Sequence, residues 1–118
     1  MIATKQYDFA IIGSGVAGLH LAFELSKNSF FDNKQIAIVD QNFTPKFNRV
    51  LSYWEVGIGQ WDAVVSSSWR KANFKSSNID LCIELDKYTY KSLNFNDFSS
   101  FCLKQIKRKS NFTCFCST

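Results

Sequence analysis

Three glycines near the start of the chain have the spacing of a phosphate-binding turn. Gly13, Gly15 and Gly18 match the pattern G-x-G-x-x-G. The first glycine of such a turn lets the chain leave a strand sharply, the second lets a pyrophosphate approach the backbone, and the third lets a helix pack closely on the strand. The N–H groups at the start of that helix then face the phosphates. The residues predicted to contact a dinucleotide are Gly13, Ser14, Gly15, Val16, Ala17 and Gly18.

A carboxylate stands where dinucleotide-binding folds place an acidic residue. Asp40 follows the apolar run 36–39, roughly twenty residues after Gly18. A carboxylate at that point accepts hydrogen bonds from both ribose hydroxyls of an adenosine and repels a 2′-phosphate, so NADP is disfavoured at this site. The alternative, a glycine-rich turn used only for packing, gives Asp40 no role. Asp40 is therefore included among the predicted cofactor-binding residues.

The glycine pattern carries this meaning only between a strand and a helix. Residues 9–12 are a short apolar run of strand type, and residues 16–28 carry apolar side chains on one helical face. Residues 36–39 form a second apolar run of strand type. This order predicts an α/β fold, a Rossmann-like FAD/NAD(P)-binding domain in which a βαβ unit contributes to a parallel sheet.

Weaker patterns follow along the chain. We expect a turn at 56–59, a short strand or apolar loop at 63–65 and a strand at 81–85. An amphipathic helix of about three turns should begin near Asn96, a residue type that caps helix N-termini well. A final strand is expected at 112–116.

The length of 118 residues allows one domain at most. A complete dinucleotide-binding fold needs more strands than these patterns supply. We therefore interpret residues 1–118 as the N-terminal part of such a domain, truncated, with the rest of the enzyme absent.

Charge and composition exclude several classes of function. The formal net charge is +4, and no basic stripe with interleaved aromatic residues suggests nucleic-acid binding. Four cysteines and one histidine lack the spacing of a zinc site, so no metal is expected. No apolar run reaches the length of a membrane span and no export signal precedes the first strand, so we expect a cytoplasmic protein. A basic cluster at 104–109 is either a solvated helix end or a peripheral contact with acidic lipid headgroups.

One segment resembles a specific family of flavoproteins. Residues 48–55 read NRVLSYWE and resemble the N-D-R-T-x-x-F-W-E stretch of the flavin-dependent lycopene cyclases. The resemblance continues through later aromatic positions and covers almost the whole chain from residue 7 onward. Those later positions are Trp61, Trp69, Phe74, Tyr88, Tyr90 and Phe98. Three positions depart from the family pattern, with Asn48, Val50 and Tyr53 in place of an acid, a threonine and a phenylalanine.

The resemblance implies FAD as the cofactor, used in its reduced form, with NAD(P)H as an external reductant. It implies a net non-redox reaction in which an acid protonates a linear carotenoid such as lycopene and the end group closes to a ring. The main catalytic acid of the family has no counterpart in this chain. Glu55 is the acid at a family-matching position and is the candidate catalytic residue, and Arg49 is predicted to contact the flavin.

Two other functions stay open on the sequence alone. One is a different FAD-dependent oxidoreductase, of the prenyl reductase or monooxygenase type, which shares the glycine pattern. The other is a non-catalytic dinucleotide-binding remnant, which the departures at Asn48 and Val50 keep open. The three tryptophans are expected either to form core or to line an apolar carotenoid channel.

Overall fold

A computed structural model describes residues 4–44 and 49–116 of the chain. The chain forms two compact units. The first unit is built from Met1–Phe47 and Ser99–Thr118, and the second from Asn48–Phe98. The family departure at Asn48 lies outside the described residues.

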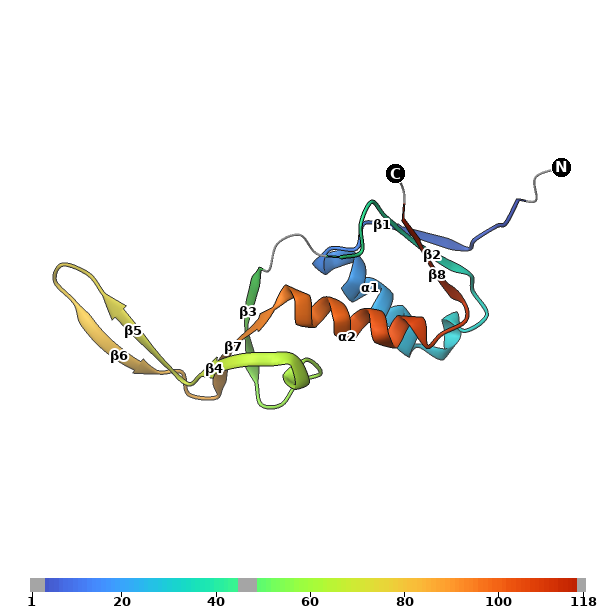
Figure 1. The fold of residues 1–118 in the computed structure, drawn as a ribbon. Helices are drawn as coiled ribbons and strands as arrows, with labels where there is room; N and C mark the ends of the chain where they lie inside the picture. The colour runs from blue at the N-terminus through green and yellow to red at the C-terminus, as the bar shows by residue number, and fades with distance from the viewer. Residues whose placement is uncertain (1–3, 45–48, 117–118) are drawn as a thin grey trace. The chain divides into compact units, whose positions relative to one another are not determined.

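The first unit contains a parallel three-stranded sheet in the order β1-β2-β8. Its strands are β1 (Phe9–Ile12), β2 (Ile36–Asp40) and β8 (Phe112–Cys116). Helix α1 (Val16–Lys27) connects β1 to β2, followed by a short 3-10 turn at Ser29–Phe31 (Figure 1). This arrangement confirms the predicted α/β class and the predicted βαβ unit.

The core of the first unit lies between one face of this sheet and the helices. Alternation in β1 and β2 points Ile11, Ile36 and Ile38 to the same face, because Ile11 pairs with Ile38 in the parallel register. These three side chains are buried, as are Leu19 and Ala22 of α1. Helix α2 (Phe95–Lys107) supplies Cys102 and Ile106 as further buried side chains of this unit. The apolar face predicted for the first helix is thus the face that packs.

The second unit contains an antiparallel sheet in the order β3-β7-β4 and a separate two-stranded ribbon. The sheet strands are β3 (Val50–Val56), β4 (Val65–Trp69) and β7 (Tyr88–Asn94). The ribbon pairs β5 (Lys71–Lys75) with β6 (Asp80–Glu84) and extends away from that sheet (Figure 1). Trp61, Leu93 and Phe98 are buried in this unit, with the Trp61 and Phe98 rings 5.0 Å apart.

The sequence patterns located some elements of the second unit and missed others. The strand expected at 81–85 is β6, shifted by one residue, and the turn at 56–59 follows β3 as expected. β3 itself was not predicted, because its half-buried positions include Glu55 while its exposed positions include Trp54. Polarity therefore does not alternate along the strand as burial does. Residues 62–64 form a 3-10 turn, so the predicted strand or loop there is a strand only from Val65 onward.

Candidate functional site

The glycine turn joins the end of β1 to the start of α1, as the pattern predicts. Gly13 has a φ of +104°, a conformation that side-chain-bearing residues rarely adopt. Its N–H donates a hydrogen bond to the Val39 carbonyl at 2.7 Å, which ties the turn to β2. A Cβ added at Gly18 would collide with the carbonyl oxygen of Gly13. Both positions therefore require glycine for the fold itself.

Gly15 differs from the other two glycines. Its φ of −76° is accessible to any residue, and no heavy atom lies within 4 Å of a Cβ built there. Neither the backbone conformation nor packing requires a glycine at this point, although glycine is among the residue types favoured at a helix N-cap. The open space in front of the Gly15 backbone is what a pyrophosphate requires.

Gly15 is also the N-cap of α1, and it supplies no side-chain cap for the first turn. The first N–H groups of an α-helix have no partner within the helix, and the helix dipole places a partial positive charge there. Val16, at the first position, is 41% exposed. The backbone N–H groups of Val16 and Ala17 are thus suited to bind an anion. The turn fits the pyrophosphate of a dinucleotide on these grounds.

Asp40 lies beside the glycine turn at the end of β2. Its Oδ2 accepts two hydrogen bonds from Ser14, from the backbone N–H at 2.6 Å and from the hydroxyl at 2.7 Å. Its Oδ1 accepts a longer bond of 3.3 Å from the Asn42 N–H. The hydrogen bonds from Ser14 lower the pKa of Asp40 to about 2. The carboxylate is therefore ionised at neutral pH, and Oδ1 is the oxygen with capacity for a further donor.

The link between Ser14 and Asp40 was missed by reasoning from the sequence. The parallel register that pairs Ile12 with Val39 brings the residues that follow each strand to the same edge of the sheet. That register, inferred from the two apolar runs, could have suggested the contact. Both Ser14 donors are directed to Asp40, so a direct contact between Ser14 and a dinucleotide stays a prediction.

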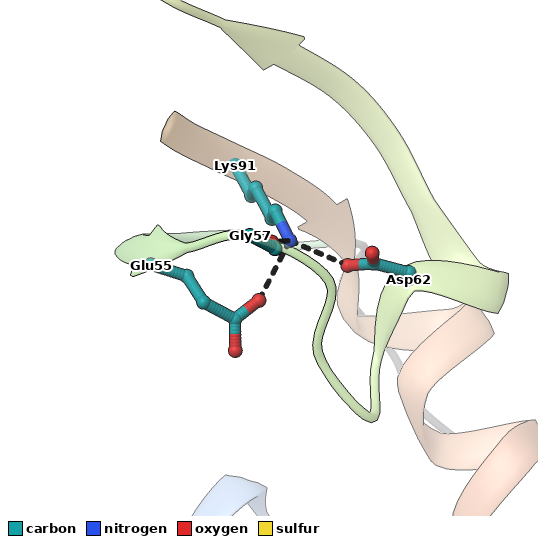
Figure 2. A network of polar contacts seen from close by, with 4 residues as sticks. All are labelled: Glu55, Gly57, Asp62 and Lys91. Atoms are coloured by element: carbon teal, nitrogen blue, oxygen red, sulfur yellow. Dashed lines mark hydrogen bonds and ion pairs between the residues drawn. The ribbon is translucent and has the colours of Figure 1, made fainter. Parts of the chain in front are cut away.

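The second unit contains a polar network around Lys91 of β7 (Figure 2). Its Nζ donates to Glu55 Oε1, to the Gly57 carbonyl and to Asp62 Oδ1, each at 2.7 Å. Lys91 as a whole is 5% exposed. The hydrogen bonds that Lys91 donates to Asp62 and Glu55 raise the pKa of Lys91, and the bond from Lys91 lowers the pKa of Asp62. The network thus holds one ammonium between two carboxylates.

Glu55 is fixed by this network. A Cβ at Gly59 would collide with the Glu55 carboxylate, so the loop after β3 closes over it. Its Oε1 accepts a hydrogen bond from the Lys91 ammonium at 2.7 Å, so this oxygen is already in contact with a cation. The structure therefore gives Glu55 a structural partner, and its predicted catalytic role stays a prediction.

The hydroxyl of Tyr53 lies close to the same network and is buried without a hydrogen-bond partner in the described part of the chain. Burial is the main cause that raises its pKa, and the negative charge of Glu55 adds to the effect. An unpartnered buried hydroxyl is costly in free energy. Tyr53 stands where the family pattern has phenylalanine, which has no such group.

Arg49 belongs to the second unit, whereas the glycine turn and Asp40 belong to the first. The Arg49 carbonyl accepts a hydrogen bond from the Phe95 N–H at 2.7 Å, and its side chain is exposed. The first unit therefore brings together all predicted cofactor residues except Arg49. Contact between Arg49 and a flavin stays a prediction.

Residues 4–44 and 49–116 contain neither a cluster of metal-ligating side chains nor a membrane-spanning helix. No group of three or more His, Cys, Asp or Glu side chains there could hold a metal ion. None of the helices in these ranges is both long and apolar enough to cross a membrane.

Known proteins resemble the chain both in sequence and in fold. Two chloroplastic thiamine thiazole synthases match over 45 residues, at 42% identity in Arabidopsis thaliana and 47% in Citrus sinensis. This match spans 38% of the chain and 12% of those proteins. Two structures of PqsL from Pseudomonas aeruginosa match 94% of the chain at 13% identity. One is a complex with 2-aminobenzoylacetate, with a TM-score of 0.73. The other describes PqsL as a probable FAD-dependent monooxygenase, with a TM-score of 0.69.

At this identity the likeness to PqsL shows the fold alone, and the chain spans 33% of those solved chains. The family model described as "Lycopene cyclase protein" matches residues 8–114. That match covers nearly all of the chain, including the glycine turn, Asp40 and the segment with the Trp54-Glu55 pair. The chain belongs to the lycopene cyclase family.

Proposed function

We propose that this chain is the FAD-binding N-terminal part of a lycopene-cyclase-type flavoprotein that closes rings at the ends of a linear carotenoid such as lycopene. The observation that carries the proposal is the open space in front of Gly15, beside a helix start that is suited to an anion. Family membership over residues 8–114 supports the same function. The chain spans only about a third of the solved flavoprotein chains that share its fold, so the proposed activity belongs to a longer protein.

The residues proposed to hold FAD divide into four roles. Gly13 and Gly18 shape the turn, and Gly15 leaves room for the pyrophosphate. The N–H groups of Val16 and Ala17 bind it, as the positive end of α1 favours. Asp40 accepts a ribose hydroxyl at Oδ1, since Oδ2 is already used twice by Ser14. The proposal therefore assigns one ribose hydroxyl to this carboxylate, whereas the sequence-based expectation assigns both.

The charge of Asp40 selects among dinucleotides. A pKa of about 2 keeps the carboxylate negative at any physiological pH. A 2′-phosphate on the adenosine would meet this charge, so NADP is disfavoured at the site. NAD(P)H is proposed only as an external source of electrons that reduces the bound flavin.

The proposed reaction leaves the oxidation state of the carotenoid unchanged. An acid delivers a proton to the terminal double bond, a neighbouring double bond attacks the resulting cation, and loss of a proton restores a neutral ring. Bound FAD in its reduced form supplies an electron-rich surface near the cation. We propose that the described residues contribute to this reaction by holding and orienting the cofactor. We further propose a cytoplasmic location with peripheral contact at a membrane, where an apolar substrate resides.

Gly15→Val tests the cofactor site with little disturbance of the fold. Its φ and the empty space around it accommodate a side chain, so the unfolding midpoint should fall only slightly, because valine is a poorer helix N-cap than glycine. The added side chain fills the space of the pyrophosphate, so FAD binding should be abolished. Flavin fluorescence during titration of the purified chain with FAD measures the affinity. Leu21→Val, an exposed change in the same helix, is the matched control and should leave FAD affinity unchanged.

Unchanged FAD affinity in Gly15→Val would refute the proposed site. The remnant interpretation makes a different prediction, namely no cooperative thermal transition with or without FAD. A different flavin oxidoreductase would be recognised in the longer protein by stoichiometric consumption of NAD(P)H together with a reduced or oxygenated product.

A further inference from the structure

A cavity of about 340 Å³ lies in the second unit, where the ribbon meets the sheet. This volume falls within the range of small-molecule sites. Apart from one lysine, its lining is apolar or aromatic. The lining residues are Trp54, Trp69, Lys71, Ala72, Phe74, Leu85 and Tyr90.

Aromatic rings form the wall of this cavity on the sheet side. The Trp54 and Tyr90 rings are 4.5 Å apart, and the Trp69 and Tyr90 rings are 6.0 Å apart. Trp54 is 55% exposed and Trp69 is 47% exposed, whereas Trp61 is 9% exposed. Trp61 is therefore core, and the other two tryptophans leave about half of their surface uncovered. Flat uncovered rings of this kind bind other flat unsaturated groups by stacking.

The apolar surface continues from the cavity along the ribbon. Ala72 pairs with Ile83, and Phe74 pairs with Leu81, so these four side chains share one face. Ile83, Phe74 and Leu81 are 42%, 55% and 51% exposed. A strand of five residues is about 17 Å long. The face is thus long enough for an extended chain and not only for a compact ring.

The opposite face of the ribbon is polar. The alternation that gathers the apolar side chains on one face places mostly charged and amide side chains on the other, namely Lys71, Asn73, Lys75, Asp80, Cys82 and Glu84. An amphipathic ribbon in which the apolar face is uncovered marks a binding surface more often than a single exposed residue does.

The charges around the cavity restrict the chemistry of its occupant. No carboxylate lines it, so a quaternary ammonium ion would find aromatic rings but no opposite charge. The Lys71 ammonium lies 4.0 Å from a Glu84 carboxylate oxygen, and both side chains are largely exposed, so water screens its charge. An anion would therefore gain little. A neutral ligand fits this lining best.

We propose that the cavity and the apolar ribbon face bind a neutral, flat, conjugated hydrocarbon chain, with one end of the chain in the cavity against Trp54, Trp69 and Tyr90. This inference rests on the proposed function and deepens it, because a linear carotenoid belongs to this chemical class. It assigns Trp54 and Trp69 to the substrate side and Trp61 to the core. Phe74, Leu81 and Ile83 contact the remainder of the hydrocarbon chain.

All-trans-retinol is a suitable probe, since it is neutral, conjugated and more fluorescent when bound. Titration of the purified chain with retinol should give saturable binding. Ala72→Leu should abolish it by filling the cavity, and Phe74→Ser should weaken it about tenfold because a half-covered aromatic contact is lost. Ile58→Ser is the matched control, because Ile58 is a 92% exposed apolar residue of the same unit outside the cavity lining. Its retinol affinity should equal that of the unmodified chain.

Competition with farnesol, an unsaturated but non-conjugated alcohol, tests whether flatness matters, and it should displace retinol only at higher concentration. Equal retinol affinity in the control and in both cavity variants would overturn the proposal. Absence of saturable retinol binding would also overturn the proposal. If the unmodified chain then sedimented with phosphatidylcholine vesicles and Phe74→Ser did not, the apolar face would be a membrane-contact surface instead. The FAD titration of Gly15→Val is independent of this result. Retinol binding without FAD binding would refute the proposed function and leave the apolar site standing.

Discussion

The two units of the chain differ in whether their polar groups already have partners within the protein. In the first unit, backbone atoms and glycines create an open, positively polarised turn beside Asp40, where we propose that the cofactor binds. In the second unit, side chains already satisfy one another, because Lys91 is held between Glu55 and Asp62. A polar site whose groups lack partners within the protein (an open site) indicates ligand binding. A polar site whose side chains pair with one another (a closed site) indicates a structural role. The candidate catalytic acid lies in the closed site, and the cofactor residues lie in the open one.

Tryptophan fluorescence allows the stability of the second unit to be followed separately from that of the first. All three lie between residues 48 and 98, so intrinsic fluorescence reports on the second unit. Hydrogen exchange, resolved by peptide, reports on both. Substitutions in each unit can therefore be separated by which signal they change.

Lys91→Met should have the largest effect on stability. It removes the ammonium and leaves two carboxylates close together without a partner, and losing one side of such a network is strongly destabilising. The tryptophan fluorescence transition should move to lower temperature by more than in any other variant considered. Combining Lys91→Met with Glu55→Gln and Asp62→Asn removes the uncompensated charges and should restore part of the loss. A midpoint unchanged by Lys91→Met would show that the network does not hold the unit together.

Gly18→Ala should destabilise the first unit, because its Cβ collides with the Gly13 carbonyl and α1 must move away from β1. Overpacking of this kind costs about 1–3 kcal/mol. Faster hydrogen exchange in peptides from α1 and β1 would measure it. Gly15→Ala is the matched control, since the same added methyl group meets no atom within 4 Å. Equal exchange in the two variants would contradict the assignment of a packing role to Gly18 and a ligand role to Gly15.

Asp40→Asn should reduce stability at neutral pH but not in strong acid. The pKa of Asp40 in the folded chain, about 2, lies below its ordinary value of 3.8. The ionised carboxylate therefore adds stability above about pH 4, and this contribution is lost as the pH falls toward 2. Chemical denaturation followed by circular dichroism at pH 7, 4, 3 and 2 should give a difference between the two chains that narrows over the last three points. A difference that is independent of pH would mean that the two bonds from Ser14 do not depend on the charge.

The sequence predicted the first unit far better than the second, for a physical reason. In the first unit the signal is carried by glycines at fixed spacing and by continuous apolar runs, which typify strands buried in a parallel sheet. β1, α1, β2 and β8 were located to within a residue or two of their observed bounds. In the second unit the antiparallel strands expose aromatic residues such as Trp54 and bury charged ones such as Lys91. Apolar side chains are exposed on these strands and a charged one is buried in an ion network, so polarity does not alternate with burial.

The site could be predicted only where a local sequence pattern determines its geometry. The glycine turn and Asp40 were recognised because their geometry follows from residue type and spacing. The Ser14–Asp40 contact needs the strand register, and the partners of Glu55 come from positions 57, 62 and 91, which no local pattern connects. The apolar cavity likewise joins residues of β3, β4, β5 and β7. Long-range pairing of strands decides such features.

Tyr53→Phe should have the smallest effect and the opposite sign. The Tyr53 hydroxyl is buried without a partner among the described residues, and it lies where two carboxylates raise its pKa further. Removing a buried hydroxyl that makes no hydrogen bond relieves a desolvation cost, so the variant should be more stable by about 1 kcal/mol. The tryptophan fluorescence transition should move upward, and Tyr90→Phe, a change of the same atom in the same unit, serves as the control. A loss of stability in Tyr53→Phe would mean that the hydroxyl has a partner, such as an ordered water bound to the Lys91 network. The polar network of the second unit would then include a water molecule in addition to its protein atoms.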